Sequence, residues 1–159
     1  MKDSLRQQFD RLGFRLAELD ALVRHAIESH EWVGVLPAIH QFCTTDLSAF
    51  YFDVRKDTLY CDPYSSVTRK ACLSVLEQLF RATTIWLAPM LSFTAEEAWL
   101  ARPAGVPDHA AESVHLRLYP AIPAGWLDSA LGDKWKTVRA LRRVVTGALE
   151  LERAEKRIG

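Results

Sequence analysis

The sequence predicts an all-α fold: an antiparallel helix bundle with a short extended segment and a final long helix. Apolar residues recur every three or four positions along most of the chain, which is the spacing of one face of an α-helix. Two such stretches, 46–60 and 65–88, flank a turn at 61–64, so these helices should pack antiparallel. Strand-like alternation of apolar and polar residues is confined to 113–120.

Length and composition fit a globular protein. Of the 159 residues, 49% are hydrophobic and 25% are charged, which is enough to build a core. No apolar run reaches the ~18 residues that span a bilayer, and the N-terminus lacks an apolar signal core, so we expect a cytoplasmic protein that contacts no membrane. Twenty basic and twenty acidic residues balance, which argues against a global positive field and leaves only local contacts with nucleic acid.

The sequence lacks the usual motifs of catalysis and metal binding. The 3 cysteines and 5 histidines form neither a C-x-x-C pair nor an H-E-x-x-H motif, and the 7 glycines form no phosphate-binding loop. We therefore predict no catalytic residue, no metal and no cofactor in this chain. Asp53 and Asp57 share a helix face and suit an acid/base pair, but ion pairs with neighbours such as Lys56 are the simpler interpretation.

Helices are expected on both sides of the turn at 61–64. An amphipathic helix covers 3–28, and after a break a long helix runs from Trp32 to Tyr60, with a bend at Pro37 because proline lacks an N–H. Thr94 and Glu97 have the spacing of a capping box, which predicts the start of a short helix ending near residue 101.

The last third of the chain begins with an exposed loop, because 102–113 carries two prolines and a glycine. The extended segment 113–120 should lie against the bundle. A final helix begins near Trp126 and should bury one apolar side, formed by Leu127, Leu131, Trp135, Val138, Leu141, Val145, Ala148 and Leu149. We divide the chain accordingly into a bundle (1–101), a loop with the extended segment (102–125) and a C-terminal helix (126–159).

Two groups of basic residues are candidates for binding RNA. The turn patch combines cations with tyrosines and consists of Arg55, Lys56, Tyr60, Tyr64, Arg69 and Lys70. The C-terminal patch consists of Lys136, Arg139, Arg142 and Arg143. Cations hold RNA phosphates and aromatic rings stack on unpaired bases. The alternative for each residue is a solvated helix surface that binds nothing.

A specific set of short sequence motifs supports RNA binding. These are Asp46-Leu47-Ser48, Asp53, Lys56-Asp57, Leu59-Tyr60, Ala88-Pro89 and Thr94-Ala95-Glu96-Glu97-Ala98-Trp99. Together they resemble the anticodon-binding helical domain of isoleucyl-tRNA synthetases, which are class I aminoacyl-tRNA synthetases. The resemblance implies that the chain binds the anticodon stem-loop of tRNA(Ile).

The same resemblance implies a longer parent enzyme, an isoleucine–tRNA ligase. The ATP-binding signatures His-Ile-Gly-His and Lys-Met-Ser-Lys-Ser do not occur here. ATP, with zinc as a further candidate, is then expected in catalytic and C-terminal domains that are missing from this chain. The alternative is a helical protein-interaction module that derives from the synthetase fold but does not bind RNA.

Overall fold

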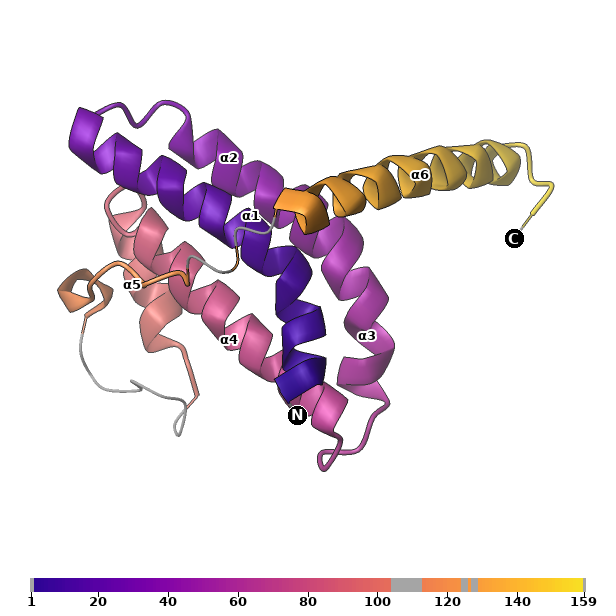
Figure 1. Cartoon of the computed structure of the whole chain (residues 1–159), viewed down its shortest axis with the longest axis horizontal. Helices are drawn as coiled ribbons and strands as arrows, with labels where there is room; N and C mark the ends of the chain where they lie inside the picture. Colours follow the sequence, from indigo (N-terminus) through magenta and orange to yellow (C-terminus); the bar gives the residue numbers. More distant parts are fainter. Residues whose placement is uncertain (1, 104–112, 124–125, 127–128, 159) are drawn as a thin grey trace.

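The computed structural model describes residues 2–103, 113–123, 126 and 129–158. These residues form helices and connecting segments and no strand, which confirms the predicted all-α class (Figure 1). The helical elements, in chain order, are α1 (Lys2–Ser29), α2 (Val35–Gln41), the π-helix η1 (Phe42–Phe52), α3 (Asp53–Tyr60), α4 (Val67–Leu87), α5 (Ser92–Leu100), the 3₁₀ turn η2 (Val114–Leu116) and α6 (Ser129–Ala154).

The predicted helical hairpin is present. α2, η1 and α3 follow one another without interruption, and α4 returns beside α3 and along α1 (Figure 1). Ser66 caps α4, because its Oγ accepts a hydrogen bond from the backbone N–H of Arg69 at 3.3 Å. The long helix begins at Val35 rather than at Trp32. Pro37 therefore falls in the first turn, where a backbone N–H has no partner in the helix.

The π-helical winding of η1 was not predicted. A π-helix pairs each residue with the fifth one along, so each turn holds about one residue more than in an α-helix and the buried face rotates. Phe50 and Tyr51 are buried, as their spacing predicts. The same 3.6-residue spacing, continued through the predicted helix 46–60, also predicts that Val54 is buried, but Val54 is 45% exposed.

The main core lies between α1, the long helix and α4. Leu16 and Val23 of α1, Phe42 of η1, and Val75 and Trp86 of α4 are each at most 1% exposed. Burying one such side chain contributes roughly 1.5–3 kcal/mol, so this apolar contact holds the bundle together.

A second, smaller core joins α5 and η2 to the end of α4, with Trp99 and Val114 each 1% exposed. The segment that begins at 113 lies against the bundle as predicted, but it opens with the 3₁₀ turn η2 instead of an extended strand. The predicted capping box is wrong: α5 starts at Ser92, and Thr94 lies inside it. Glu96 instead accepts hydrogen bonds from Ser113 Oγ at 3.0 Å and from the Val114 backbone N–H at 2.8 Å.

α6 crosses the long helix and then extends away from the bundle (Figure 1). Most of the described part of the side predicted to be buried is exposed: Val138, Leu141, Val145 and Leu149 are 38%, 65%, 50% and 41% accessible. Trp135 of that side is half-buried, and its ring centre lies 6.3 Å from that of Phe50. The helix turns an adjacent side to the bundle, where Gly132 is buried. The expected start near Trp126 falls beside residues 127–128, which lie outside the described residues. Among the described helices, none is long and apolar enough to cross a membrane.

Candidate nucleic-acid interface

A groove of about 610 Å³ lies where α6 crosses η1. We call it the α6 groove. Its charged lining residues are Arg15 of α1, Asp46 of η1, and Lys136, Arg139, Arg142 and Arg143 of α6. Five basic residues and one acidic residue line the groove, although the chain as a whole is neutral. Glu18, Asp53 and Asp133 also pair with lining cations, so the groove with its partners keeps an excess of one positive charge. The structure thus brings the whole C-terminal patch to one cavity.

Asp46 anchors this groove. It is 4% exposed, and its Oδ2 accepts a hydrogen bond from Arg15 Nε at 3.1 Å, while Oδ1 pairs with Arg139. Burial lowers the pKa of Arg15, but hydrogen bonds and charges from Glu18 and Asp46 outweigh burial and raise it above its ordinary value. The guanidinium therefore stays charged, and one buried carboxylate ties α1, η1 and α6 together.

Arg142 forms the second tie of α6 to the long helix. Its Nη2 donates to Asp53 Oδ2 at 2.5 Å, and its guanidinium lies 5.0 Å from the centre of the Phe50 ring. Asp53 also accepts a hydrogen bond from Lys56 Nζ at 3.1 Å. The hydrogen bonds from Arg142 and Lys56 lower the pKa of Asp53. The interpretation of Asp53 as an ion-pair residue is confirmed.

The C-terminal patch therefore divides into two pairs. Arg139 and Arg142 are bound to carboxylates of η1 and α3. Lys136 is exposed and pairs only with Asp133, a surface contact at 3.0 Å within its own helix. Arg143 is exposed and makes no ion pair with any described residue. Lys136 and Arg143 are the cations of the groove that a ligand can reach.

The turn patch lies at the far end of the long helix from Val35. Tyr60 and Tyr64 are each 84% exposed, so their rings are accessible. Arg69 covers the Tyr64 ring at 4.4 Å and donates to the Asp62 backbone carbonyl at 2.6 Å, which holds the turn in shape. Arg55 is half-buried, whereas Lys70 is exposed.

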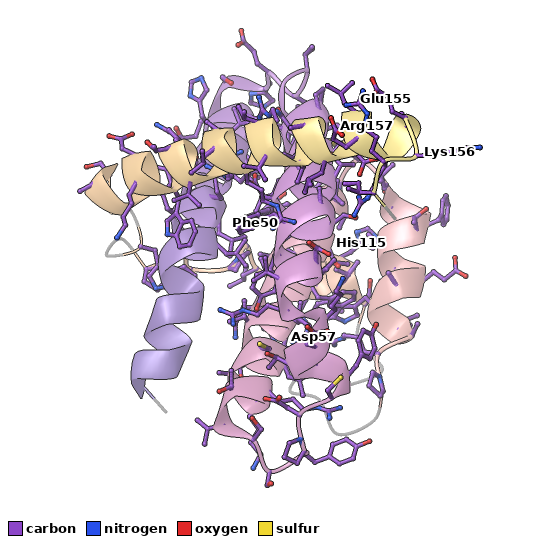
Figure 2. The ribbon with its side chains drawn as sticks, turned by 90° about the vertical axis from the view of Figure 1, so that its right-hand side faces the viewer. Phe50, Asp57, His115, Glu155, Lys156 and Arg157 are labelled. Atoms are coloured by element: carbon purple, nitrogen blue, oxygen red, sulfur yellow. The ribbon has the colours of Figure 1, made fainter. Side chains whose placement is uncertain are left out.

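Acidic residues surround the cations of the turn patch. The four basic residues of the patch share their stretch with Asp53, Asp57 and Asp62, which leaves an excess of one positive charge. Asp57 lies on α3; in Figure 2 it is below Phe50, and α6 crosses above both. The exposed tyrosines of this patch suit base stacking.

Arg15 and Asp46 were missed as members of a site. The sequence singled out Asp46 only as part of a motif of the resembling family, and Arg15 lies within the amphipathic helix predicted over 3–28 without any signal of its own. The contact between Asp46 and Arg139 spans 93 positions of sequence, which no local spacing reveals. Among the described residues, no group of three or more histidine, cysteine, aspartate and glutamate side chains is arranged to hold a metal ion.

Residues 14–159 match the family described as the anticodon-binding domain of tRNA ligase, and the chain belongs to this family. The match includes the α6 groove and the turn patch.

Similar proteins are isoleucine–tRNA ligases. Those of Agrobacterium fabrum and Bartonella henselae are 55% and 52% identical over 145 residues, and that of Gluconobacter oxydans is 54% identical over 145 residues. Each alignment covers 91% of this chain and 14% or 15% of the relative, so the chain spans about a seventh of the length of these proteins. The predicted resemblance to the isoleucyl-tRNA synthetases is confirmed.

Proposed function

We propose that this chain binds the anticodon stem-loop of tRNA(Ile) and holds it for an aminoacylation reaction catalysed elsewhere in a longer polypeptide. The observation that carries this proposal is the family match over residues 14–159, together with more than 50% identity to isoleucine–tRNA ligases. The α6 groove supports it, since a neutral chain needs such a local concentration of cations to contact RNA.

The role is one of positioning. Holding the anticodon end of a tRNA places its distant acceptor end, and binding free energy remote from the reacting atoms accelerates a reaction through such placement. We propose that the parent protein is a cytoplasmic isoleucine–tRNA ligase. ATP, with zinc as a further candidate, would be bound by its other domains.

Titration of the chain with tRNA tests the proposal. Binding of a tRNA(Ile) transcript is measured by fluorescence anisotropy at 50 and 200 mM salt, beside a tRNA with another anticodon and a duplex DNA of equal charge. We expect weak binding that falls with salt and favours tRNA(Ile), because a single domain makes only part of the contacts of the whole enzyme. Equal affinity for the tRNA and the DNA would refute the proposal.

A second candidate function is protein interaction without RNA. The exposed apolar residues of α6 favour it, because Leu141, Val144 and Leu151 are 65%, 69% and 68% accessible on a helix that extends from the bundle. The titration separates the two functions. Absence of tRNA binding at 50 mM salt, in a chain that is folded by circular dichroism, would favour protein interaction over RNA binding.

A further inference from the structure

We infer that the α6 groove binds the sugar–phosphate backbone of the RNA, with Lys136 and Arg143 as the phosphate contacts, and that this binding is independent of base sequence. The inference rests on the proposed function and deepens it. It assigns to one surface the task of positioning the RNA strand, and it separates that task from the reading of bases.

The convergence of cations on one cavity favours the groove over the turn. Five basic side chains line the groove. Four of them pair with carboxylates, which leaves Arg143 without an ion pair to any described residue, so the groove with its partners has an excess of one positive charge, as the turn patch has. Because screening at physiological salt limits the reach of a charge to about 8 Å, phosphate binding depends on cations that gather at one place rather than on the neutral total. Lys136 and Arg143 reach the same cavity, and this shared cavity makes the groove the phosphate site that we infer.

The ion pairs of the groove determine which of its cations can contact a phosphate. Arg15 and Arg139 compensate the buried carboxylate of Asp46, and Arg142 is bound to Asp53. Replacing any of these three would move α6 as well as remove a charge. Lys136 and Arg143 project from the helix that these ion pairs hold in place, so they are presented to a ligand at a defined position.

The lining of the groove explains why it does not read bases. Among the described residues that line the groove, Phe50 is the only aromatic one; it is 8% exposed, and the Arg142 guanidinium lies over its ring. No ring in the groove offers a free face on which an opened base can stack. Exposed rings are found instead at Tyr60 and Tyr64 in the turn patch.

The experiment compares two double variants that remove equal charge. In the groove variant, Lys136→Gln is combined with Arg143→Gln. In the control variant, Lys134→Gln is combined with Lys156→Gln; both lysines are exposed and outside the groove lining, and Figure 2 shows Lys156 at the far end of α6. Circular dichroism checks that both variants keep the helical content of the wild type.

Affinity is measured for tRNA(Ile) and for a tRNA with another anticodon between 50 and 200 mM salt. Loss of two phosphate contacts should reduce the slope of log affinity against log salt by about 1.4–1.8 and weaken binding at 50 mM salt by about tenfold or more. Both tRNAs should be affected equally, and the control variant should retain the wild-type slope.

Three results would overturn the inference while leaving the proposed function intact: a groove variant with the wild-type slope, an equal loss of slope in the control variant, or a loss confined to tRNA(Ile). If the wild-type chain itself binds neither tRNA, the proposed function fails, and this inference fails with it. The wild-type titration thus tells the two failures apart.

Discussion

Replacing Gly132 by alanine should loosen α6 from α1. An added Cβ would lie 2.8 Å from both Cε1 and Cζ of the half-buried Phe14 ring. Carbon atoms prefer a separation of ~3.5–4.0 Å, so the ring or the helix must move. Overpacking of this kind costs about 1–3 kcal/mol, whereas alanine gains ~1 kcal/mol over glycine in a helix. We expect a net loss of up to about 2 kcal/mol.

Gly147 provides the matched control in the same helix. An added Cβ at this position meets no atom within 4 Å. Gly147→Ala should therefore show only the gain in helix propensity, a stabilisation of about 0.5–1 kcal/mol. The two substitutions make the same chemical change, and only the neighbouring Phe14 ring gives them opposite signs.

Amide hydrogen exchange along α6 measures both effects. Gly132→Ala should increase exchange in the first turns of α6 and lower the urea midpoint of unfolding, because this end of the helix is docked on α1. Gly147→Ala should slow exchange in the projecting half of the helix and should raise the midpoint slightly rather than lower it. If Gly132→Ala protects α6 as Gly147→Ala does, the close packing of Gly132 against Phe14 does not hold the helix.

Three further predictions test the anchor, the core and the thiols. Asp46→Asn leaves two partly buried guanidinium groups without their shared charge and should cost about 1–3 kcal/mol in urea unfolding; a cost below ~0.5 kcal/mol would show that α6 docks without this ion pair. Leu79→Ala truncates a side chain that is 3% exposed and should lower the free energy of unfolding by about 2–5 kcal/mol, with near-neutral behaviour contradicting the assigned core. Cys61 is exposed, whereas burial raises the pKa of the half-buried Cys43 thiol, so at pH 8 a disulfide reagent should label Cys61 first; equal rates would contradict the structure.

Local patterns predicted the central helices well, because the spacing of apolar and polar residues over a few turns shows which side of a helix will be buried. The spacing of Val75, Leu79 and Trp86 predicts the buried side of α4, and all three are buried. The helix predicted over 65–88 is present, and in the structure Ser66 caps it by accepting a hydrogen bond from the Arg69 backbone N–H. Thr94 and Glu97 carried an equally clear capping signal, yet α5 starts earlier, at Ser92.

The orientation of α6 could not be predicted in this way. Its apolar stripe predicts a buried side, yet Leu141 and Val145 of that stripe are exposed. The helix contacts the long helix through Trp135, Arg139 and Arg142. Those contacts join residues that are 93 and 89 positions apart. A sequence pattern reports which residues share a face, but not which distant face they meet.

The sequence by itself determined the all-α class, the hairpin of long helices and the family to which the chain belongs. Periodicity, capping and characteristic sequence motifs are local properties, so they can be recognised without the fold. The ten candidate residues for RNA binding were also chosen from sequence, and their role stays a prediction. Only the tertiary structure decided that η1 winds as a π-helix, that Asp46 joins three helices, and that Lys136 and Arg143 remain accessible beside two arginines bound to carboxylates. These features depend on the long-range packing of α6 across η1, and ion pairs between such distant residues form only when the chain has folded.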